Sequence, residues 1–232
     1  MKIFTRQTMV LALATGGLAA AAHADALQDQ VLAGARATRS DIYAFRRTIA
    51  IERTGAARQV FVEQFDPRKP TAQQWTLVSV DGHAPAEKDL SSWRKGDRGP
   101  VPSYNQIARW FGGPATRSDG PAGYVTYRFA RLPAGALKMG SHDASADTQA
   151  EAVVNTQGRI PYVERVRLVS TKSFRMMLVA SVQSMATSGH YRVQPDGVVA
   201  PAESTSRIIG SLFGKDQTIQ AVATYSDFQK VR

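Results

Sequence analysis

From residue 43 to the C-terminus, the sequence consists mostly of short segments in which apolar and polar side chains alternate. An alternation with period two predicts a β-strand that buries one face and exposes the other. In residues 43–53, for example, Phe45, Ile49 and Ile51 fall on one face. Turn sequences such as Asp81-Gly82 separate several of these segments. Because short turns join antiparallel neighbours, one large antiparallel sheet is expected.

The alternation predicts about ten strands. They cover residues 43–53, 58–65, 75–80, 124–131, 150–155, 162–169, 174–184, 191–193, 198–199, 206–213 and 218–225. The clearest segment is 174–184, which is expected to form a single strand. Its apolar side chains, which all point the same way, are Phe174, Met176, Leu178, Ala180 and Val182.

Three helices are expected among these strands. Residues 25–40 carry acidic side chains in the early turns and basic ones near the end, which matches the helix dipole. Residues 86–95 follow a proline, and residues 104–111 have the apolar spacing of an amphipathic helix. Ser103 and Gln106 are spaced as a capping box. The predicted fold class is therefore α+β: a curved open antiparallel sheet, or half-barrel, with helices capping a hydrophobic cavity.

The first 24 residues have the pattern of a secretory signal peptide. Lys2 and Arg6 precede an apolar run over residues 8–22, and Ala22-His23-Ala24 fits the small-x-small cleavage rule. We expect cleavage after Ala24 and a single exported, periplasmic domain over residues 25–232. An uncleaved N-terminal anchor is the alternative, although the apolar run is short for a membrane span.

Composition excludes several chemistries. The chain has no cysteine, so it has no disulfide, no thiol nucleophile and no cysteine-bound metal. Its formal net charge is +10, which falls to +8 without residues 1–24. The basic residues are scattered along the predicted strands, which argues against nucleic acid as a partner. Solvated strand faces explain such a pattern, and attraction to an anionic membrane surface or an acidic partner is the functional alternative.

No sequence motif indicates an enzyme. His142-Asp143 with Asp147 offers ligands for a divalent ion, but a polar surface loop explains the same residues. Glu52 and Glu63 lie on neighbouring predicted strands and are the carboxylates best placed to meet, although pairing with nearby arginines is the simpler expectation. We therefore predict a protein without enzymatic activity, metal or cofactor.

The apolar side chains are the remaining candidates for a binding site. They would fill an ordinary core, but a curved open sheet with helices over it can also enclose a lumen for an acyl chain. The residues expected to line that lumen are Trp75, Leu77, Tyr104, Ile107, Trp110, Phe111, Tyr127, Phe129, Phe174, Met176 and Leu178.

The C-terminal sequence resembles a known group of exported proteins. Residues 210–216 (GSLFGKD) and 223–231 (ATYSDFQKV), together with the strand pattern of residues 162–199, are similar to the LolA/LolB-like periplasmic superfamily. This group includes lipoprotein carriers and lipid-sensing domains. The resemblance implies an unclosed antiparallel half-barrel with helices over a hydrophobic cavity.

The resemblance and the apolar pattern together predict non-enzymatic binding of a lipid or lipoprotein acyl chain, with residues 104–111 as a lid. The expected partners are a lipid or acylated lipoprotein, and further an inner- or outer-membrane protein or an anionic membrane surface. An alternative hypothesis is an envelope regulatory or interaction module whose core is filled and whose surface carries the function.

Overall fold

The computed structural model describes residues 25–39, 41–96, 101–177 and 180–231. The predicted signal peptide, residues 1–24, lies outside the described residues. The strands are β1 Tyr43–Arg53, β2 Gln59–Phe65, β3 Trp75–Val80, β4 Thr116–Asp119, β5 Tyr124–Phe129, β6 Lys138–Met139, β7 His142–Asp143, β8 Thr148–Asn155, β9 Tyr162–Ser170, β10 Phe174–Met177, β11 Ala180–Val193, β12 Val199–Leu212 and β13 Lys215–Lys230. The helices are α1 Ala26–Ala37, η1 Thr71–Gln73, α2 Glu87–Lys95 and η2 Tyr104–Arg109.

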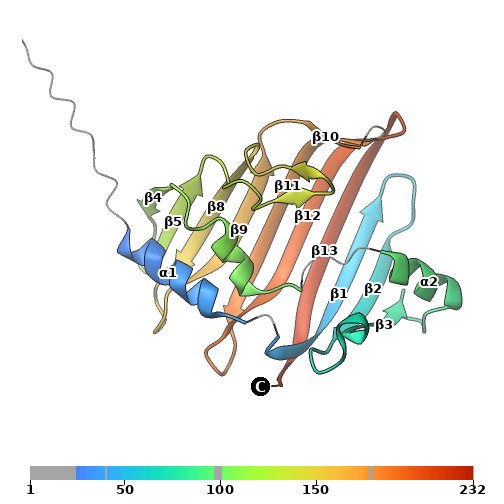
Figure 1. The fold of residues 1–232 in the computed structure, drawn as a ribbon, viewed down its shortest axis with the longest axis horizontal. Helices are drawn as coiled ribbons and strands as arrows, with labels where there is room; N and C mark the ends of the chain where they lie inside the picture. Colours follow the sequence, from blue (N-terminus) through green and yellow to red (C-terminus); the bar gives the residue numbers. More distant parts are fainter. Residues whose placement is uncertain (1–24, 40, 97–100, 178–179, 232) are drawn as a thin grey trace, which may run out of the picture.

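One 11-stranded antiparallel sheet dominates the structure (Figure 1). Its order is β3-β2-β1-β13-β12-β11-β9-β8-β5-β4, with β10 paired to β11 off this path. The sheet is open, because β3 and β4 lie at opposite ends of the path. The predicted fold class, an open antiparallel sheet with few helices, is confirmed.

The strand register defines two faces of the sheet. A single row of paired residues crosses it, and cross-strand partners point to the same side. That row is Tyr127, Ala152, Val166, Gly189, Ser204, Ala223, Ile49, Phe61 and Val80. We call its side the inner face, because α1 and η2 pack on it, and the opposite side the outer face.

The main core lies between the inner face and the elements α1 and η2. Val31 and Ala35 of α1 are fully buried, as are Phe111 and Val154. The segment 104–111 forms a 3-10 helix and not the expected α-helix. In a 3-10 helix every third side chain points the same way, so Tyr104, Ile107 and Trp110 all face the core. The expected capping box is also absent, because the Gln106 side chain donates to the Val101 carbonyl oxygen.

The expected single strand 174–184 is wrong. The chain reverses after β10, so that Phe174 pairs with Val182 across a hairpin. Both side chains then lie in one small apolar cluster with Ala144 and Met185. The segment contains neither Gly nor Pro, so its sequence carries no turn signal. Leu178, one of the predicted lining residues, lies outside the described residues.

Asp25 attaches α1 to the sheet. Its Oδ1 accepts hydrogen bonds from the Leu27 and Gln28 amides, at 3.0 and 3.4 Å, as an N-cap does. Its Oδ2 accepts a hydrogen bond of 2.8 Å from the Tyr127 hydroxyl, and Arg117 forms an ion pair with it. Burial favours the neutral acid, but these hydrogen bonds outweigh burial and hold the pKa of Asp25 below its ordinary value.

Replacing Asp25 with Ala is expected to lower the free energy of unfolding by about 1–2 kcal/mol, as the loss of a helix N-cap does. The lowered pKa means that the carboxylate stabilises the fold above its ordinary titration range and loses this effect as the pH falls through it. Urea denaturation at pH 7 and pH 3 measures both effects. Equal destabilisation at the two pH values would contradict the role of the charge.

Candidate functional site

A pocket of about 570 Å³ lies on the inner face between α2 and strands β1 and β2. Its volume falls in the range of about 300–1,000 Å³ that small-molecule sites occupy. Its floor consists of Ile49, Ile51 and Phe61, all of which are only partly buried. The inner face is thus packed under α1 and η2 but hollow under α2.

A buried ion pair closes one end of this pocket. The Arg47 guanidinium lies 2.6 Å from the Glu63 carboxylate, and the two side chains are only 9% and 5% exposed. The indole nitrogen of Trp93, on α2, donates a 2.6 Å hydrogen bond to Glu63 Oε1. The Arg47 guanidinium also lies 4.1 Å from the centre of the Trp75 ring, a cation–π contact. Burial of a charge is tolerated here because each charged group has partners.

Helix α2 covers the pocket without a core of its own. None of its residues is buried, and its hydrogen bond from Trp93 to Glu63 connects it to the sheet. The Asp89 carboxylate accepts a hydrogen bond from the Ala86 amide at the start of the helix. An element with few buried apolar contacts opens at low free-energy cost. The geometry therefore describes a pocket with an apolar floor and polar walls, beneath a helix with few buried contacts.

The predicted lining residues lie in separate places. Six of them belong to the core under α1 and η2, namely Tyr104, Ile107, Trp110, Phe111, Tyr127 and Phe129. Phe174 and Met176 lie in a second cluster near the β6–β7 hairpin. Trp75 and the buried Leu77 lie on β3, where Leu77 pairs with Glu63 at the polar end of the pocket. Their role as ligand contacts stays a prediction, as does the lid role of residues 104–111.

The floor of the pocket was not among the residues predicted from the sequence. Its signal was nevertheless present, because Arg47 occupies a position of the apolar row that contains Phe45, Ile49 and Ile51. Glu63 does the same between Phe61 and Phe65. One charge of each sign in facing apolar rows indicates a buried pair beside an apolar surface.

Glu52 and Glu63, the carboxylates considered best placed to meet, do not meet. Glu63 points to the inner face, whereas Glu52 follows Ile51 and points to the outer face, where it pairs with Arg58 at 3.5 Å. Adjacent strands bring two side chains together only when their register places them on the same side. The simpler expectation of pairing with arginines holds for both carboxylates.

The residues considered for a metal site are held in a structural loop. Asp143 accepts hydrogen bonds from the Gly135 and Ser145 amides, and Asp147 pairs with Lys172. The His142 ring stacks on Phe174 at 4.4 Å. Within the described ranges, no three His, Asp or Glu side chains are grouped so that they could hold a metal ion.

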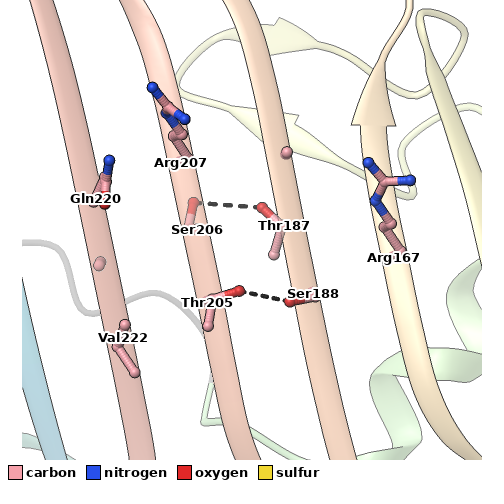
Figure 2. A pocket seen from close by; sticks show the side chains of 10 residues that line it. Arg167, Thr187, Ser188, Thr205, Ser206, Arg207, Gln220 and Val222 are labelled. Atoms are coloured by element: carbon pink, nitrogen blue, oxygen red, sulfur yellow. Dashed lines mark hydrogen bonds between the residues drawn. The ribbon is translucent and has the colours of Figure 1, made fainter.

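The outer face has two shallow hollows, of about 320 and 290 Å³, that share Gln220 and Val222. Figure 2 shows the larger one, where Arg167 and Arg207 flank a pair of hydrogen-bonded hydroxyls. These hydroxyls belong to Ser188 and Thr205 and are 2.5 Å apart. The charged residues that line this hollow are both basic, whereas the pocket under α2 is lined by charged groups of both signs around an apolar floor.

Comparison with known proteins gives one structural similarity. No protein family model matches the chain, and no curated protein matches it. A crystal structure of a LolA superfamily protein from Nitrosomonas europaea is 12% identical and aligns with a TM-score of 0.39. The alignment covers 89% of this chain and 92% of that chain. Within the described part of the chain, no helix is both long and apolar enough to cross a membrane.

Proposed function

We propose that this protein is a non-enzymatic, periplasmic binding or carrier protein for the acyl chain of a lipid or lipoprotein. The observation that carries the proposal is the pocket under α2, whose apolar floor is left partly exposed by a helix without buried residues. Ile49, Ile51 and Phe61 form one contiguous, partly exposed apolar surface, and such surfaces mark ligand-binding grooves. The signal peptide pattern and the C-terminal sequence resemblance support the same function.

Binding in this pocket would draw its free energy from burial. Each methylene group removed from water contributes about 0.8 kcal/mol. The acyl chain would lie along Ile49, Ile51 and Phe61, and α2 would shift outward to admit it. Arg53 and Gln59 lie at the end of the pocket away from the Arg47–Glu63 pair. They would contact the polar end of the ligand.

The first test is native mass spectrometry of the protein purified without detergent from a periplasmic extract, followed by organic extraction. The expected result is a co-purifying lipid or acylated peptide. As a second readout, the delipidated protein is titrated with a fluorescent fatty acid in detergent-free buffer. A protein that carries no acyl ligand from the cell and binds none in the titration would contradict the proposal.

Replacing Ile51 with Asp is expected to weaken fatty-acid binding by about 10- to 100-fold. The acyl chain would then contact a charged carboxylate, and the apolar contact with the Ile side chain would be lost. The matched control is Ala50→Asp. Ala50 is the neighbouring residue on β1, is also partly buried, and lines a hollow of the outer face. Fluorescence titration of both variants gives the two affinities, and circular dichroism checks that both are folded. Equal losses in the two variants would exclude the inner-face pocket as the binding site.

A second candidate function is supported by the outer face. Arg167 and Arg207 flank the hollow in Figure 2, and within the described residues neither forms an ion pair. Such a surface suits an interaction module with an acidic partner. A protein that remains free of ligand in the mass spectrometry experiment but binds an acidic envelope protein would favour this function.

A further inference from the structure

The hairpin that joins β12 to β13 extends past the end of β1, while β11 stays paired with β12 as far as Leu212, and it ends in exposed apolar side chains. Phe213 is 73% exposed and Leu212 is 43% exposed. The last residue of β1, Arg53, pairs with Ile219, whereas β12 and β13 remain paired as far as Leu212 and Lys215. From Ile219 to Lys215, β13 therefore continues for four residues beyond the end of β1. At about 3.3 Å per residue, this distance is about 13 Å. In Figure 1 this tip lies beyond the turn between β1 and β2.

The conformation of Phe213 makes its presence at the tip unusual. Phe213 has a φ of +50° and Gly214 a φ of +74°, so both turn residues are left-handed. A two-residue turn of this kind favours Asn or Asp before the Gly, and a bulky residue there is an outlier. Within the described residues, Phe213 stacks on no other aromatic ring. Neither the turn nor burial in the folded protein therefore accounts for a phenylalanine.

The charges at this end of the sheet are mainly basic. Lys215 directly follows the turn, and Arg53 and Arg175 lie on strands that end nearby. All three are exposed, and none forms an ion pair within the described part of the chain. Asp216 is the one carboxylate on the tip, and it points to the opposite face from Lys215. The tip thus places an aromatic and an aliphatic side chain beside cations.

We propose that the β12–β13 tip inserts into the surface of an anionic lipid bilayer. An aromatic ring at the headgroup level, with cations beside it, is the arrangement that binds such a surface. A narrow tip offers far less than the roughly 800 Å² per partner that a stable protein interface buries, so a bilayer fits better than a protein. This inference does not depend on acyl-chain binding. It would also bring Arg53 and Gln59, at one end of the pocket, toward the membrane.

The test is co-sedimentation of the purified protein with vesicles. Vesicles of phosphatidylcholine alone are compared with vesicles that contain one third phosphatidylglycerol. Binding to the anionic vesicles is expected to weaken about 10- to 100-fold in the Phe213→Ser variant, because the variant lacks the aromatic ring that would be buried in the bilayer. The control is Val222→Ser, since Val222 is 40% exposed on the same strand but far from the tip. It is expected to bind like the unmodified protein.

A Phe213→Trp variant provides a direct readout of insertion. Its additional fluorescence is expected to shift to the blue and to resist quenching by acrylamide when anionic vesicles are added. Unchanged vesicle binding by Phe213→Ser, or equal binding to the two kinds of vesicle, would overturn the proposal. So would a concentration-dependent dimer that Phe213→Ser abolishes, because the tip would then contact a second copy of the chain. Fatty-acid binding, measured without vesicles, is expected to be unchanged in Phe213→Ser.

Discussion

Replacing Glu63 with Ala is expected to lower the free energy of unfolding by about 3–5 kcal/mol, the cost of leaving a buried charge without its partner. Arg47, whose side chain is 9% exposed, would lose the carboxylate that lies 2.6 Å away. The indole of Trp93 would lose its acceptor at the same time, and α2 would lose a hydrogen bond to the sheet. Urea denaturation followed by circular dichroism measures the change.

The matched control is Glu52→Ala. Glu52 on β1 pairs with Arg58, which directly precedes β2, but both side chains are about 60% exposed, so the loss is expected to be about 0–1 kcal/mol. A double variant, Arg47→Met with Glu63→Leu, is expected to recover most of the stability that Glu63→Ala loses, because no unpaired charge then remains buried. A loss from Glu63→Ala no larger than that from Glu52→Ala would show that the Arg47 charge reaches water.

Replacing Phe111 with Ala is expected to lower the free energy of unfolding by about 3–5 kcal/mol through loss of burial and creation of a cavity. Phe111 is fully buried and contacts the rings of Trp110, Tyr127 and Phe129 at centroid distances of 5.3–5.9 Å. The backbone carbonyl oxygen of Phe111 accepts a hydrogen bond from the Gln28 side chain, which connects α1 to this segment. Thermal and urea denaturation measure the loss.

Phe213→Ala is the control for Phe111→Ala. The same chemical change at a side chain that is 73% exposed is expected to alter stability by no more than about 0.5 kcal/mol. If Phe111→Ala were equally mild but reduced fatty-acid binding, residues 104–111 would act as the lid that the sequence analysis expected. If it is strongly destabilising, this segment is primarily part of the core.

Most strands could be predicted from the sequence, because alternation with period two is a local property. Residues 43–53 and 75–80 show this, since the predicted bounds agree with β1 and β3. The short strands β4, β6 and β7 were not predicted, and β12 was predicted as two strands, at 198–199 and 206–213. A further exception is the reversal between β10 and β11, where the apolar run continues without a turn residue. There the pairing of Phe174 with Val182 decides the outcome, and pairing partners are not encoded locally.

The candidate site was less accessible to sequence reasoning. Trp75 and Leu77, which were predicted as lining residues, neighbour Arg47 and Glu63 but do not line the pocket. Ile49, Ile51 and Phe61 form its floor and were not predicted. Large aromatic side chains did not indicate the pocket, because most of them fill the core under α1 and η2. The pocket is hollow because α2, which covers it, has no buried side chains, whereas η2 fills its part of the inner face with Tyr104 and Ile107. The positions of these two helices over the sheet are set by the tertiary structure.

The sequence by itself determined the class of the fold: alternating segments joined by short turns leave an antiparallel sheet as the way to bury one face of each strand. It also determined which side chains share a face. The tertiary structure alone decided the strand order, which brings β1 beside β13, and the burial of Arg47 against Glu63. It also decided which part of the inner face stays uncovered. The physical reason is that alternation is set between neighbours along the chain, whereas burial depends on contacts between residues far apart in sequence.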